Sequence, residues 1–77
     1  MDRQREITYM QVRMARCAMR TWDATLSQVS QRFAKYDVTA YIEQNYDLLH
    51  LEGDEAVFED VAAYVNRREA EEHAQAR

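Results

Sequence analysis

The sequence predicts an all-α domain of four helices, three core helices followed by a longer C-terminal one. The 77 residues contain no proline, one glycine and no run of β-branched residues. Apolar residues recur instead at the spacings of three and four that are typical of helices. A chain this short buries only roughly 60% of its unfolded surface, and its single cysteine cannot form an internal disulfide. We therefore expect one marginally stable domain over residues 1–65, followed by a charged helical extension or frayed tail over residues 66–77.

The first helix is predicted over residues 5–22. Its buried side is an apolar stripe made of Ile7, Met10, Met14 and Cys17. A basic stripe on another face consists of Arg13, Arg16 and Arg20. Met19 and Trp22 lie off the apolar stripe. We therefore expect these two residues and the three arginines to be available for contact with a partner.

Two shorter amphipathic segments follow. Leu26 and Ser27 have the pattern of a hydrophobic residue followed by an N-cap, which predicts that a second helix starts here. Its buried side is expected to contain Val29, Phe33 and Tyr36. Thr39 is the expected N-cap of a third helix that extends to about Glu52. The apolar side of that helix is predicted to contain Ile42, Tyr46 and Leu49, widened by Tyr41, Asn45 and Leu48.

Gly53 separates the third predicted helix from the last. It stands just past a helix, where glycine enters the left-handed backbone region at little cost, so we expect it to cap the third helix. Asp54 is expected to cap the start of the last helix. The apolar face of that helix is predicted to contain Val57, Phe58, Val61, Ala62, Tyr64 and Val65. From Asn66 onward alanine is the only apolar residue type, so the C-terminal segment has no apolar face to bury.

Signals for catalysis and for metal binding are missing. When Gly53 is aligned with the sixth position of a calcium-binding loop, Leu48 occupies the first ligand position and offers no oxygen. Cys17, His50 and His73 show none of the paired spacings of zinc sites. Cys17 lies on an apolar stripe and is interpreted as a small buried hydrophobe. We expect a non-enzymatic protein with no cofactor and no structural metal.

Charge is divided unevenly along the chain. Residues 1–36 contain seven basic and three acidic residues (net +4), and residues 37–77 contain three basic and eleven acidic ones (net −8), which together give −4. This asymmetry marks either a partner surface or an attraction between helices of one domain. The alternative function is a compact DNA-binding regulator. Its candidate recognition helix, residues 39–52, is acidic and has no Lys or Arg, so we do not expect nucleic-acid binding.

The expected location is the cytoplasm. The first residues show no apolar run before their charges, as a secretion signal would require. A lone cysteine suits a reducing compartment. No stretch approaches the roughly 20 apolar residues that span a bilayer, so no membrane association is expected.

The segment YIEQNYDLLHLEGDEAVFEDVAAYV, residues 41–65, resembles the DUF3791 family of short bacterial proteins. The matching residues are Tyr46, Asp47, Leu49, His50, Gly53 and the Val57 and Val61 pair. The segment TLSQVSQRFAKYDV fits the middle of the family pattern, so the resemblance spans about residues 5–65, whereas the arginine-rich first helix and the charged tail depart from it. The resemblance implies a protein encoded beside toxin-like or ADP-ribosyltransferase-like genes, and thus an accessory or antitoxin-like partner of such a protein.

His50 has two interpretations. In the structural one, which we favour, its imidazole donates to free carbonyls at the end of the third helix and packs against Tyr46. In the functional one, Tyr46, Asp47 and His50 form an exposed recognition corner for another protein. The sequence thus predicts a small protein–protein interaction module that binds either a protein partner or a second copy of itself.

Overall fold

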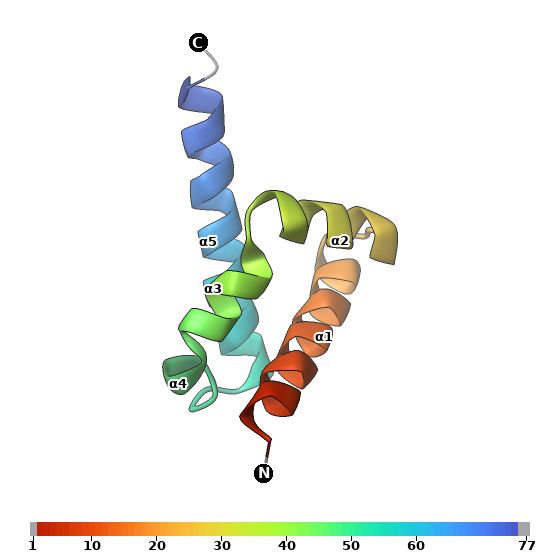
Figure 1. Cartoon of the computed structure of the whole chain (residues 1–77). Coiled ribbons are helices and arrows are strands. Elements are labelled where there is room, and N and C mark those ends of the chain that lie inside the picture. The colour runs from red at the N-terminus through yellow and green to blue at the C-terminus, as the bar shows by residue number, and fades with distance from the viewer. Residues whose placement is uncertain (1, 76–77) are drawn as a thin grey trace.

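The structure is a computed structural model that describes residues 2–75, all of whose regular elements are helices. The helices are α1 (Arg3–Thr21), α2 (Leu26–Lys35), α3 (Val38–Gln44), α4 (Tyr46–Leu49) and α5 (Asp54–Gln75). The prediction of an all-α domain with a long C-terminal helix is confirmed. Figure 1 shows α1 and α5 beside each other, α2 crossing near the end of α1, and the last turns of α5 extending beyond the other helices.

The starts of α1 and α2 are fixed by side-chain caps. The Asp2 carboxylate accepts the backbone N–H of Gln4 at 3.0 Å, so α1 begins earlier than predicted. The N-cap of α2 is Thr25, and the prediction of Ser27 is wrong. Thr25 and Gln28 form a capping box in which each side chain accepts the backbone N–H of the other, at 3.1 and 2.9 Å. This reciprocal pair satisfies two donors at the helix start.

Aspartates, and not the glycine, occupy the left-handed positions of the fold. Asp23 follows α1 with a φ of 49°, and Asp37 follows α2 with a φ of 55°. After Asp23 the chain turns back, and the N–H of Ala24 donates to the carbonyl of Met19 at 3.1 Å. Asp37 also directly precedes α3, so the prediction that Thr39 caps this helix is wrong. The two sharp changes of direction around α2 therefore depend on aspartates in a conformation that costs a residue with a β-carbon energy.

The third predicted helix is two helices. The chain breaks at Asn45, where φ is −109° and ψ is 11°. The Asn45 side-chain amide donates to the carbonyl of Tyr41 at 2.8 Å, and its backbone N–H reaches the same oxygen at 3.1 Å. Leu48, predicted to widen the apolar side, is 70% exposed. A polar side chain that bonds to the preceding turn competes with helix continuation, which gives this break its physical reason.

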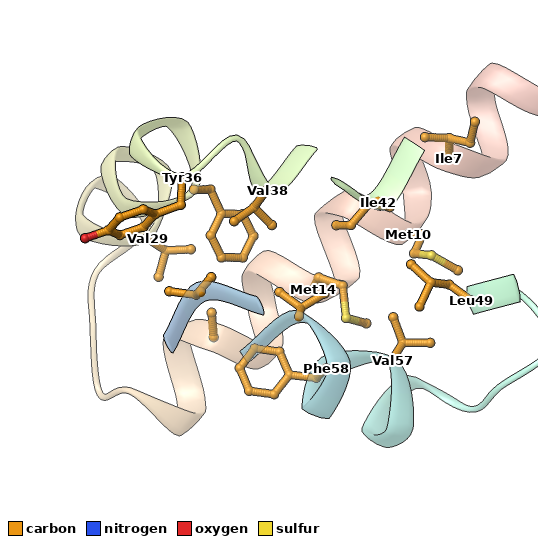
Figure 2. Packing of buried hydrophobic residues seen from close by; sticks show 14 of the residues in the cluster. Ile7, Met10, Met14, Val29, Tyr36, Val38, Ile42, Leu49, Val57 and Phe58 are labelled. Atoms are coloured by element: carbon orange, nitrogen blue, oxygen red, sulfur yellow. The ribbon is translucent and has the colours of Figure 1, made fainter. Parts of the chain in front are cut away.

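One hydrophobic core joins all five helices. Met14 is fully buried and lies between side chains of α3 and α5 (Figure 2). Most of the predicted stripe residues are buried, which confirms the helical periodicity as the source of the core. The buried residues are Ile7, Met10, Met14, Ala18, Val29, Phe33, Tyr36, Val38, Ile42, Tyr46, Leu49, Val57, Phe58, Val61 and Val65. Cys17 is only partly buried, at the edge of this cluster.

The helical segment that follows Val65 is attached to α2 on one side. Arg32 pairs with Glu69 at 2.8 Å, and Lys35 pairs with Glu72 at 2.9 Å. Arg68 donates to the hydroxyl of Tyr64 at 2.7 Å. Residues 66–75 thus continue α5 as a regular helix whose inner side is polar, and the last two residues of the predicted tail lie outside the described residues.

Candidate interaction surfaces

The corner formed by α4 is fastened to the start of α1. The Tyr46 hydroxyl donates to a carboxylate oxygen of Glu6 at 3.3 Å, and its ring is almost completely buried. Asp47 accepts a hydrogen bond from the Arg3 guanidinium at 2.7 Å. The same guanidinium lies 5.4 Å from the centre of the Tyr46 ring. These contacts hold the corner in one position relative to α1.

Hydrogen bonding, charge and burial at this corner shift the pKa values of three side chains. The Arg3 guanidinium, through its hydrogen bond and its charge, lowers the pKa of the Asp47 carboxyl, and Asp47 in turn raises the pKa of Arg3. Burial, followed by the negative charge of Glu6, raises the pKa of the Tyr46 hydroxyl. Asp47 is therefore an ionised, already paired carboxylate at neutral pH, although both partners of the ion pair remain largely exposed.

His50 ends α4 and stacks on Tyr46. The two rings are 5.1 Å apart between centres and nearly parallel, and the imidazole Nδ1 lies 2.9 Å from the Tyr46 carbonyl oxygen. A carbonyl oxygen can only accept, so this contact is a hydrogen bond when Nδ1 carries the proton. This geometry agrees with the structural interpretation, in which the imidazole donates a hydrogen bond to a carbonyl at a helix end. The residue as a whole nevertheless faces solvent.

Gly53 does not have the conformation predicted for it. No glycine of the chain has a positive φ, and a β-carbon built on Gly53 meets no atom within 4 Å. The prediction of a left-handed cap at Gly53 is therefore wrong. Its carbonyl instead accepts the N–H of Val57 at 3.0 Å, which places Gly53 at the start of α5. Asp54 is the first residue of α5, and its carboxylate receives a hydrogen bond from Arg13 at 3.1 Å.

The predicted contact residues of α1 divide into two groups. Trp22 packs on the core, with its ring centre 6.2 Å from that of Phe33 and 5.7 Å from that of Phe58. Met19 is also partly buried against the core. Arg13 is paired with Asp54, as described above. Arg16 and Arg20 are exposed, and Arg20 approaches the sulfur of Cys17 at 3.5 Å. Among residues 2–75, the Arg16 side chain forms no hydrogen bond or ion pair.

Two exposed leucines lie next to the corner. The sequence patterns did not identify either of them as a residue that contacts a partner. Leu48 lies in α4 and Leu51 follows it, and they are 70% and 76% exposed. Leu51 belongs to none of the predicted apolar stripes. This could have identified it from the sequence as an exposed apolar residue. Leu48 was hidden because the unbroken-helix prediction assigned it to the core. The neighbouring Tyr46 and Leu49 are buried, so the exposed pair stands on an anchored support.

Within residues 2–75, no group of three or more potential metal ligands comes together. In the same part of the chain, none of the helices is long and apolar enough to cross a membrane. The fold and its surfaces define a small helical domain with a partly apolar corner that hydrogen bonds connect to α1. The chain matches the model of the family described as Protein of unknown function (DUF3791) over residues 10–68, and it therefore belongs to this family. No curated protein and no solved structure matches it.

Proposed function

We propose that this protein is a non-enzymatic interaction module that acts as an accessory or antitoxin-like partner of a neighbouring bacterial protein in the cytoplasm. The observation that carries the proposal is the exposure of Leu48 and Leu51 on the anchored corner. The two residues are close along the chain, since the backbone N–H of Leu51 donates to the carbonyl of Leu48 at 3.3 Å. Exposed apolar side chains that gather on one surface are typical of protein-binding sites. The family resemblance supplies the class of partner, a toxin-like or ADP-ribosyltransferase-like protein encoded nearby.

The contacts of the motif residues support the proposal that the corner positions Leu48 and Leu51 for a partner. Tyr46, Asp47 and His50 each make an intramolecular contact that fixes the corner. Leu48 is the exposed apolar residue of the motif, whereas Asp47 and His50, although exposed as well, are held by contacts within the fold. In this proposal the motif builds the support and Leu48 and Leu51 contact the partner, so His50 has a positioning role.

Co-expression of the tagged protein with the product of each adjacent gene tests the proposal. We expect one product to form a discrete complex whose stoichiometry light scattering can measure. Replacing both Leu48 and Leu51 by serine should weaken capture by at least about a hundredfold, because burial of each leucine contributes about 1.5–3 kcal/mol. Leu26→Ser is the matched control, since Leu26 is 57% exposed and belongs to α2, which lies far from α4 in Figure 1.

Three results would contradict the proposal. One is an absence of any complex with the adjacent gene products. A second is a complex that tolerates the double serine variant. A third is selective, salt-dependent binding of a duplex from the gene's own upstream region, which would favour the DNA-binding alternative. Exposed Arg16 and Arg20 are the feature that makes this alternative worth testing.

A further inference from the structure

A solvent-facing stripe runs along α1 on the side away from the core. We call it the outer stripe, and it consists of Arg5, Tyr9, Val12, Arg16 and Arg20. Successive members are three or four residues apart, so their side chains lie on one helical face about 22 Å long. In Figure 1, α1 forms one edge of the molecule.

The outer stripe is exposed and its charge is not neutralised. Tyr9 is 56% exposed and Val12 is 44% exposed, and both are large apolar side chains in the middle of the stripe. The other arginines of α1, Arg3 and Arg13, pair with Asp47 and Asp54. Among the described residues, the three arginines of the stripe form no ion pair. The stripe is therefore positively charged, although the net charge of the whole chain is −4.

An apolar groove runs beside the middle of the outer stripe. It lies between α1 and α2, has a volume of about 280 Å³ and includes Val12, Ala15 and Phe33 in its lining. Val12 thus belongs both to the stripe and to the wall of the groove. An element that follows the stripe can insert an apolar side chain there while its acidic residues reach the arginines at the two ends.

We propose that the outer stripe and its groove receive an acidic amphipathic helix of the protein partner. The inference rests on the proposed function, because that helix belongs to the partner. Charge decides against a second copy on the same stripe, since a two-fold pairing centred on Val12 brings Arg5 of one copy against Arg20 of the other. A duplex fits less well, because Tyr9 and Val12 interrupt the arginines and the remaining surface is acidic.

Titration of the isotope-labelled full chain with two synthetic peptides tests the inference. The first is a helical peptide of about 20 residues with glutamates spaced to meet the stripe arginines and a leucine facing the groove. The second is identical except that glutamines replace the glutamates. We expect the acidic peptide to shift amide signals of residues 5–20 and of α2, and to bind less tightly at 1 M salt than at 0.15 M salt. The glutamine peptide should bind at least about tenfold more weakly.

Charge reversal supplies the matched controls. The double variant Arg16→Glu, Arg20→Glu should weaken binding of the acidic peptide at least about tenfold. Arg67→Glu changes an exposed arginine of α5 and should leave the affinity within about twofold. Circular dichroism establishes that all variants remain folded. Equal affinity for both peptides, or unchanged binding by the double variant, would overturn the inference.

Two further measurements separate this inference from the proposed function. Retained peptide binding without any complex with an adjacent gene product supports the outer stripe as a site and refutes the proposed function. The complex without peptide binding supports the proposed function and overturns the inference. A short duplex that shifts the residue 5–20 signals at lower concentration than the acidic peptide also overturns it, because the stripe would then be a phosphate-binding surface.

Discussion

Replacing Asp37 by glycine is expected to raise the free energy of unfolding. Asp37 has a φ of 55°, and its side chain makes no capping hydrogen bond at the start of α3. The residue is exposed, so its carboxylate contributes no buried contact. Glycine enters the left-handed region without the clash of a β-carbon, so the substitution removes strain without removing packing.

The magnitude follows from two opposing terms. The left-handed conformation costs a residue with a β-carbon roughly 1–2 kcal/mol. Glycine also makes the unfolded chain more flexible, which offsets about 0.4–1 kcal/mol of that gain. We therefore expect Asp37→Gly to stabilise the fold by about 0.5–1 kcal/mol, or a rise of about 2–8 °C in Tm for a domain of this size.

Gly53→Ala is the matched comparison, because Gly53 has no positive φ and has free space where a β-carbon would stand. Its effect should lie within about 0.5 kcal/mol of zero, since reduced unfolded-state entropy and a less favourable residue before α5 oppose each other. Urea unfolding followed by circular dichroism measures both variants. Destabilisation by Asp37→Gly together with a loss above about 1 kcal/mol for Gly53→Ala would refute the reasoning and place the left-handed residue at Gly53.

Two other predictions concern the corner. His50→Ala should lower stability by about 0.5–2 kcal/mol and weaken partner capture only in proportion; normal melting combined with lost capture would instead show a recognition residue. The pKa of Asp47 is lower in the folded protein than in the unfolded chain, so its ionised carboxylate stabilises the fold. This contribution to the free energy of unfolding is present above the unfolded-state pKa near 4 and disappears as the pH falls through the folded-state pKa, and Asp47→Asn removes it. Urea midpoints should therefore differ between wild type and variant at neutral pH and converge in acid, and a constant difference would contradict the ion pair with Arg3.

The buried faces of the helices could be predicted from the sequence because periodicity is a property of consecutive residues. Ile7, Met10 and Met14 recur at helical spacing and are all buried. The break at Asn45 could not be predicted in the same way. Its side chain forms a hydrogen bond to Tyr41 within one turn, but nothing in the apolar pattern distinguishes this from continued helix. Capping has the same difficulty, since Thr25 and Ser27 are both good N-cap residues and the bond to Gln28 decides between them.

The surfaces were harder to predict than the core. Trp22 lies off the apolar stripe of α1, and this position suggested that it is exposed to solvent. Instead, Phe33 of α2 and Phe58 of α5 pack against its ring. Arg13 was predicted to be available for a partner, but it pairs with Asp54. Asp54 is distant in sequence and becomes a neighbour of Arg13 only when α5 packs on α1. The glycine was misleading for a related reason. A left-handed turn favours glycine, but an aspartate can occupy it when the surrounding structure compensates for the strain, as at Asp23 and Asp37.

The packing of α5 against α1 has a consequence for the order of folding during synthesis. Val57, Val61 and Val65 are fully buried, and all three belong to α5, which is synthesised after α1, α2, α3 and α4. Until they emerge, α1, α2 and α3 can pack on one another, but the apolar faces of α1 and α3 lack the side chains with which α5 covers them. The earlier helices then remain open to chaperones or to a partner already present, and the finished fold forms only after translation has passed α5.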